Sequence, residues 1–163
     1  MQMDIEIIRV IDSIQTNIYS LLMGNYHSSI SKLNFEDMQT VCKNPEVYLL
    51  INTLNETDQS CLLLGTVKCS QEESLVNKYI TSNKHIQIII YGRNCNDDSV
   101  IKKYQQLKTI GFSNVFIYSG GLFEWLTLQD IYGADEFPTT SKQLDILKYK
   151  SNKVLNAGLL TNN

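Results

Sequence analysis

The fold is decided by residues 88–125, which read IIIYGRNCNDDSVIKKYQQLKTIGFSNVFIYSGGLFEW. Residues 86–91 are apolar except for Gln87, as expected for a strand that is covered on both faces. Residues 92–97 follow as a polar loop, and Asp98 or Ser99 then caps the start of a helix. This part of the stretch therefore predicts a strand, a loop and a helix in immediate succession.

The second half of the stretch adds another strand and another helix. Gly111 ends the preceding helix, and residues 115–118 form a second apolar strand. The pair Gly120–Gly121 then turns the chain into a helix over residues 122–131.

Four further elements are predicted upstream from apolar runs and capping residues. They are a short strand over 26–33, a helix to Val41 capped by Asn34, a buried strand over 47–51 and a helix over 71–80 capped by Ser70. Glu73, three residues after Ser70, matches a capping box. Because strands and helices alternate, we expect an α/β fold with a mainly parallel central sheet and helices on both faces.

Length and charge narrow the function classes. A chain of 163 residues is expected to form one domain. Its net charge of −3 comes without a basic stripe, so we expect no nucleic-acid partner. Its apolar runs are too short to span a bilayer, and its N-terminus does not read as a signal peptide. We therefore expect no membrane partner and an intracellular, cytoplasmic protein.

The thiols and imidazoles do not form a metal-binding pattern. The four cysteines contain no CxxC pair, and the chain has only two histidines, His27 and His85. We therefore expect free thiols in a reducing compartment, no metal site and no cofactor.

The ends of the chain are expected to flank the domain. We divide the chain into an N-terminal amphipathic helix over 1–25, a domain over 26–140 and a C-terminal tail over 141–163. In the first segment, Ile7, Ile11, Ile14, Ile18 and Leu21 share one helical face. That face either docks on its own domain or pairs with a protein partner or a second copy of the chain.

The loop over residues 92–97 is the candidate site, because ligands of open parallel sheets bind beyond the carboxyl ends of the strands. Its residues are Gly92, Arg93, Asn94, Cys95, Asn96 and Asp97. Backbone N–H groups at this place can hold an anion or stabilise a thiolate. Asp97 and Asp98 oppose anion binding and thiolate formation alike, because nearby carboxylates repel anions and favour the neutral thiol. A phosphatase loop needs an arginine six residues after its cysteine, and Ile101 stands there.

The same stretch resembles a rhodanese-like domain. The resemblance is carried by IIIYG, then Gly111–Phe112, Val115, Gly120–Gly121 and Trp125, and it extends over residues 28–128. It implies a three-layer rhodanese-like fold. In that family a catalytic cysteine directly follows the tyrosine at the end of the central strand.

The departures from the family pattern fall on its reactive positions. Gly92 stands where the catalytic cysteine is expected, and Cys95 falls about one residue late when the loops are aligned. Asn52 and Leu54 stand where the family often has aspartate and arginine. The usual catalytic residues therefore have no counterparts here.

Two functions remain open. In the first, the chain is a non-catalytic binding or structural module with a rhodanese-like fold. In the second, it is a sulfurtransferase with Cys95 as the persulfide-forming nucleophile, supported by Arg93 and the loop amides.

The longer pattern is also similar to rhodanese-like proteins of large nucleocytoplasmic DNA viruses and some protists. Residue usage agrees, since 12 lysines against 2 arginines, with 15 asparagines and 18 isoleucines, suggest an AT-rich genome.

Overall fold

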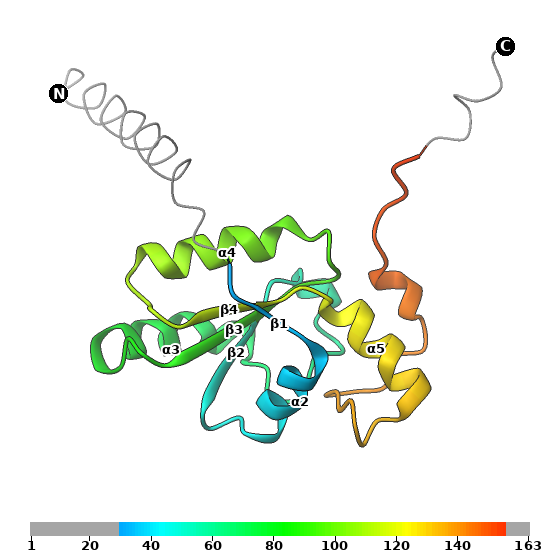
Figure 1. Cartoon of the computed structure of the whole chain (residues 1–163), viewed down its shortest axis with the longest axis horizontal. Helices are drawn as coiled ribbons and strands as arrows, with labels where there is room; N and C mark the ends of the chain where they lie inside the picture. The colour runs from blue at the N-terminus through cyan, green and yellow to red at the C-terminus, as the bar shows by residue number, and fades with distance from the viewer. Residues whose placement is uncertain (1–29, 156–163) are drawn as a thin grey trace, which may run out of the picture. The chain divides into compact units, whose positions relative to one another are not determined.

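The computed structural model describes residues 30–155, and the expected N-terminal helix lies outside them. Figure 1 shows strands and helices alternating along this part of the chain. The elements are β1 (Lys32–Leu33), α2 (Phe35–Lys43), β2 (Tyr48–Asn52), α3 (Cys69–Ser82), β3 (Gln87–Tyr91), α4 (Asp98–Thr109), β4 (Val115–Tyr118) and α5 (Gly121–Tyr132), with short 3-10 helices η1 (Glu56–Asp58) and η2 (Ile146–Tyr149).

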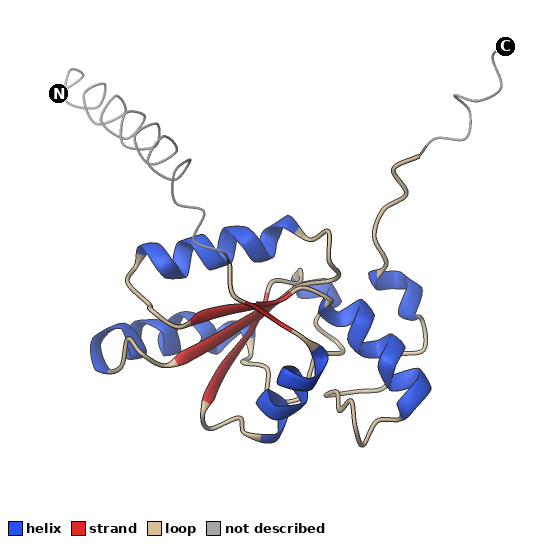
Figure 2. Ribbon diagram, viewed as in Figure 1, coloured by secondary structure: helices blue, strands red, loops and turns tan. Residues whose placement is uncertain are grey.

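Within residues 30–155 the sheet has four parallel strands in the order β1-β4-β3-β2. The three strands predicted from apolar runs lie together in it, with Asn52 beside Tyr91 and Tyr91 beside Tyr118 at their carboxyl ends. Figure 2 shows the sheet between helices. The predicted α/β fold with a parallel central sheet is confirmed.

Alternate side chains of each strand enter opposite layers, as strand geometry requires. One set, including Leu50, Ile89 and Tyr118, joins α2 and α5 in a continuous apolar cluster. Trp125 of α5 is fully buried at its centre, with its ring edge-on to Phe137 at a centroid distance of 4.9 Å. Trp125 therefore anchors α5 in the core.

The other sheet face lies under α4, whose Val100 and Leu107 are buried. Helix α3 has no buried residue and is tied to α4 by an ion pair between Glu72 and Lys103 at 2.6 Å. Helices therefore cover both faces of the sheet, which gives three layers.

The N-terminal cap of α2 agrees with the sequence prediction, whereas those of α4 and α3 differ from it. Asn34 caps α2 in a reciprocal capping box with Asp37, as its sequence position predicted. The predicted cap of α4 is wrong by one residue, because Asp97 supplies the capping carboxylate. The box predicted at Ser70 is also wrong, because α3 already begins at Cys69 and the Lys68 carbonyl accepts its first backbone hydrogen bonds.

Two segments differ in extent from the expectation. The strand predicted over 26–33 is only two residues long within the described part, at Lys32–Leu33. The tail predicted from residue 141 is described to residue 155, and its Tyr149 is fully buried in the apolar cluster. The tail therefore contributes a core side chain to the domain.

Candidate functional site

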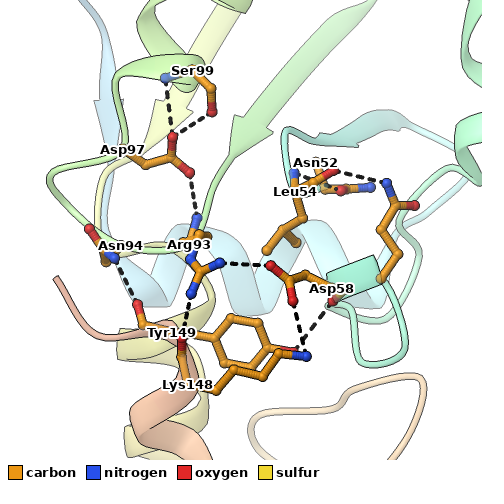
Figure 3. A network of polar contacts seen from close by, with 10 residues as sticks. Asn52, Leu54, Asp58, Arg93, Asn94, Asp97, Ser99, Lys148 and Tyr149 are labelled. Carbon is orange, nitrogen blue, oxygen red and sulfur yellow. Dashed lines mark hydrogen bonds and ion pairs between the residues drawn. The ribbon is translucent and has the colours of Figure 1, made fainter. Parts of the chain in front are cut away.

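The loop over residues 92–97 connects β3 to α4 at the carboxyl edge of the sheet, where the sequence predicted it (Figure 3). It begins after Tyr91, whose hydroxyl accepts a hydrogen bond from the Leu63 amide at 3.2 Å and lies 2.8 Å from the Thr66 hydroxyl. Burial raises the pKa of Tyr91. This buried phenol fixes the end of the central strand, and hence the start of the loop.

The Asp97 carboxylate lies inside the loop and is bound by the loop's own backbone. Its Oδ2 accepts a hydrogen bond from the Arg93 amide at 2.8 Å. Its Oδ1 accepts from the Ser99 amide at 3.1 Å and from the Ser99 hydroxyl at 2.5 Å. The start of α4 favours negative charge here, so the chain provides its own anion at this helix N-terminus.

Gly92, which the sequence resemblance places at the position of a catalytic cysteine, has no room for a side chain. A Cβ atom there would lie 2.3 Å from Asp97 Oδ2 and 2.6 Å from Val100 Cγ2. Both distances are shorter than a van der Waals contact allows, so a cysteine requires Asp97 and Val100 to move. The Asp97 carboxylate occupies the space that a nucleophile at this position would need.

The start of α5 holds the other side of the loop. The Leu122 and Phe123 amides donate hydrogen bonds to the Gly92 and Arg93 carbonyls, each at 2.9 Å. Gly121 has a φ of +63°, and a Cβ there would lie 2.6 Å from the Gly92 carbonyl oxygen. The second glycine of the Gly–Gly pair therefore permits the close approach of loop and helix.

The Arg93 side chain is bound to other parts of the chain. Its guanidinium donates to Asp58 Oδ2 at 2.7 Å and to the Lys148 carbonyl oxygen. Asp58, which is 8% exposed, also accepts from the Lys148 ammonium at 3.0 Å. The hydrogen bond to Asp58 raises the pKa of Lys148. One buried carboxylate therefore holds two cations, which matches the preference of buried charges for paired partners.

Residues 145–152, which we call the C-terminal strap, lie across this end of the loop (Figure 3). The Asn94 side-chain amide donates to the Tyr149 carbonyl at 2.7 Å, and its oxygen accepts from the Ser151 hydroxyl at 3.1 Å. Burial raises the pKa of the Tyr149 phenol, whose hydroxyl donates to the Asp58 carbonyl at 3.4 Å. The strap is thus joined to the loop through both side chains and main chain.

Cys95 is exposed and lies apart from this network. Its thiol is 3.7 Å from Asn96 Oδ1, and no other hydrogen bond from it is found within residues 30–155. The Arg93 guanidinium points instead to Asp58 and the strap. Arg93 and Cys95, which the sulfurtransferase alternative pairs, therefore lie close in sequence but make no contact with a common partner.

Asn52 is the last residue of β2, Leu54 lies two residues after it, and both side chains have structural roles. Asn52 is 5% exposed, and its side-chain oxygen accepts from the Leu54 amide at 3.1 Å in a local turn. Leu54 is 6% exposed and belongs to the apolar cluster. Leu54 is therefore an apolar core side chain at the position where the sequence resemblance leads one to expect an arginine.

Sequence reasoning missed Asp58, Lys148 and Tyr149. Asp58 lies in a polar run, and nothing in its sequence neighbours distinguishes it from Glu56. The sequence held a weak indication that Tyr149 is buried. It lies three residues after Ile146, so the two apolar side chains share one face of a short helical turn.

A cavity of about 510 Å³ opens beside the loop. It is lined mainly by polar residues, among them Asn94, Asn96, Asp98, Lys150 and Ser151.

Residues 30–155 contain no cluster of His, Cys, Asp and Glu that could hold a metal ion. No helix in the same range is long and apolar enough to cross a membrane.

Neither a protein-family model nor a curated protein matches this sequence. Solved structures do match. Ygr203w, a yeast protein tyrosine phosphatase of the rhodanese family, is 10% identical with a TM-score of 0.51, and the match covers 71% of this chain and 95% of that chain. The Alr3790 protein of Anabaena sp. is 19% identical with a TM-score of 0.50, covering 71% and 97%.

A third match is the BH2092 protein of Bacillus halodurans, with 15% identity, a TM-score of 0.50 and coverage of 69% and 81%. At such identities the similarity concerns the fold. The chain has a rhodanese-like α/β fold, as the sequence resemblance implied.

Proposed function

We propose that this chain is a rhodanese-like protein without sulfurtransferase activity, which acts as a protein-binding module. The observation that carries the proposal is the position of Asp97. Its Oδ2 lies 2.3 Å from the point where a side chain at Gly92 would begin. A carboxylate therefore stands where a sulfurtransferase needs its thiolate.

The chemistry of sulfur transfer explains why this exchange is disabling. A thiolate must attack the outer sulfur of the donor, form a persulfide and release the remaining anion. Gly92 has no nucleophile. The Arg93 and Ser99 amides, which are placed to stabilise an anion, already donate to Asp97. The fixed negative charge also repels an anionic donor such as thiosulfate.

Cys95 does not supply the missing chemistry. Its thiol is exposed next to Asn96, while the nearby Arg93 guanidinium is bound to Asp58. A nucleophilic cysteine needs a base or a cation at hand, and this one has neither among its contacts in residues 30–155. Phosphatase chemistry lacks support as well, since Ile101 stands six residues after Cys95.

The binding role is supported by how the loop uses its polar groups. Arg93, Asn94 and Asp58 all make hydrogen bonds to another peptide segment, the strap. The site is therefore built for contacts with polypeptide. Residue usage and the resemblance to viral and protist proteins support a viral or protist source and a place of action inside cells.

The test is a sulfur-transfer assay from thiosulfate to cyanide with purified full-length protein. We expect the wild-type rate to equal that of Cys95→Ser. Cys69→Ser is the matched control, because Cys69 is also exposed but lies on α3. A wild-type rate that survives in Cys69→Ser and disappears in Cys95→Ser would show that Cys95 is catalytic and would refute the proposal.

A further inference from the structure

The C-terminal strap is attached to the domain in an unusual way. Among residues 30–155, no backbone-to-backbone hydrogen bond joins residues 145–155 to the rest of the domain. The backbone bonds of the strap are local, from Lys148 to Asp145 and from Lys150 to Leu147. The strap is therefore held by side chains, much as a bound peptide is held in a cleft.

Three polar side chains of the domain make these contacts. Arg93 and Asn94 donate to two successive strap carbonyls, those of Lys148 and Tyr149. Such contacts fix the main chain of a peptide whatever its sequence. Asp58 adds selectivity, because its carboxylate binds the Lys148 ammonium and its carbonyl accepts from the Tyr149 hydroxyl.

Burial within the strap is concentrated in one residue. Tyr149 is fully buried and Ile146 packs, partly buried, against the same apolar cluster, whereas Leu147 is 64% exposed. Arg93 and Lys148 also lie near the Tyr149 ring, at 5.8 Å and 5.4 Å from its centroid. One fully buried aromatic anchor in a segment whose other side chains are partly or fully exposed is typical of a short peptide ligand.

We infer that Asp58, Arg93 and Asn94 form a peptide-binding site that the strap occupies in cis. Its partner is a protein segment with a basic residue directly followed by tyrosine, as in Lys148–Tyr149. This inference rests on the proposed function as a binding module and names the partner class of that site. Binding in trans requires the strap to leave, so the partner competes with it.

The competition sets the expected affinities. A tethered segment has an effective concentration in the millimolar range, so the intact chain should bind a free peptide weakly. Replacing Tyr149 removes the anchor of the tethered segment and leaves the site open. The free peptide should then bind at least about tenfold more tightly to the variant than to the wild-type chain.

The experiment uses full-length Tyr149→Ala protein and a synthetic peptide with the sequence of residues 145–153, DILKYKSNK. Isothermal titration calorimetry should show that this peptide binds to the Tyr149→Ala protein. A control peptide in which alanine replaces the tyrosine should not bind. Adding Asp58→Asn to the variant should weaken binding about tenfold, since the ammonium loses its partner. A folded Tyr149→Ala protein that ignores the peptide, or binds both peptides equally, would overturn the inference.

A second measurement covers the case in which Tyr149→Ala does not fold. In wild-type protein, strap amides should exchange with deuterium well before those of β3, because a cis ligand opens without global unfolding. Exchange of the strap together with β3 would make it part of the core and would also overturn the inference. Neither readout depends on sulfur transfer, so either failure would leave the assay for the proposed function intact.

Discussion

The start of α5 and the loop over residues 92–97 lie against each other but are built in different ways. In α5, Leu122 and Trp125 are fully buried apolar side chains, and Trp125 is one of the residues that carry the rhodanese-like resemblance. In the loop, the Asp97 carboxylate accepts three hydrogen bonds, and Gly92 stands where the resemblance implies a cysteine. The start of α5 contributes apolar side chains to the core, whereas the loop is held mainly by hydrogen bonds to its backbone groups.

The contrast shows that the loop and the core are stabilised by different kinds of contact. Asp97 accepts hydrogen bonds from one loop amide and one amide of α4, and α5 donates two hydrogen bonds to loop carbonyls. The loop is therefore stable without any bound anion. Substitutions in the two segments should separate packing from loop chemistry.

The largest effect is expected for Trp125→Ala, which should lower the free energy of unfolding by about 3–5 kcal/mol. The indole is fully buried between Tyr118 and Phe137 and donates to the Pro138 carbonyl at 3.2 Å. Urea unfolding followed by circular dichroism measures the change. A loss below about 1 kcal/mol would mean that this segment is not the anchor of the core.

Gly121→Ala should cost about 3 kcal/mol, because the new Cβ adds a clash with the loop to an unfavourable left-handed backbone. Gly111→Ala is the matched control. Gly111 also has a positive φ, of +105°, but the atom nearest to its added Cβ is the Nζ of the flexible Lys84 side chain, at 3.6 Å. The control should therefore cost only about 1 kcal/mol. Equal losses in the two variants would show that the loop does not press on α5.

Asp97→Ala should cost about 1–2 kcal/mol, since α4 loses its cap and two amides lose their acceptor. Asp98→Ala, at an exposed neighbour with no side-chain hydrogen bond within residues 30–155, should change little. Added inorganic phosphate should raise the melting temperature of Asp97→Ala and not that of the wild type, because it can replace the missing anion. Equal phosphate effects in both proteins would contradict a loop already filled by Asp97.

The smallest effect concerns the thiols under native conditions. Iodoacetamide should modify the exposed Cys69 and Cys95 and spare the buried Cys42, since burial raises the pKa of Cys42 to about 12. Cys95 should react no faster than Cys69, as quantified by peptide mass spectrometry. Selective, rapid modification of Cys95 would indicate an activated nucleophile.

The sequence was informative where burial imposes a pattern. The predicted strands over 47–51, 86–91 and 115–118 match β2, β3 and β4 to within one residue at each end. A strand buried on both faces must be apolar throughout, so its signal is local. The rhodanese-like fold followed from these strands and the Gly–Gly turn.

The loop contacts could not be predicted in the same way. Asp97, Asp98 and Ser99 are all good capping residues, so sequence alone does not select the one that enters the loop. Arg93 is joined to Asp58 and to Lys148, which are 35 and 55 residues away in the chain. Such pairs are created by the fold and leave no local pattern.

The most direct test of the central claim is the intact mass of the protein after incubation with thiosulfate under non-reducing conditions. We predict that neither the wild type nor Gly92→Cys gains the mass of a sulfur atom. The wild type has no thiol at the family's position, and in the variant the Asp97 carboxylate obstructs it. A wild-type persulfide that maps to Cys95 would contradict the account, since it would show that the loop still carries out the first step of sulfur transfer.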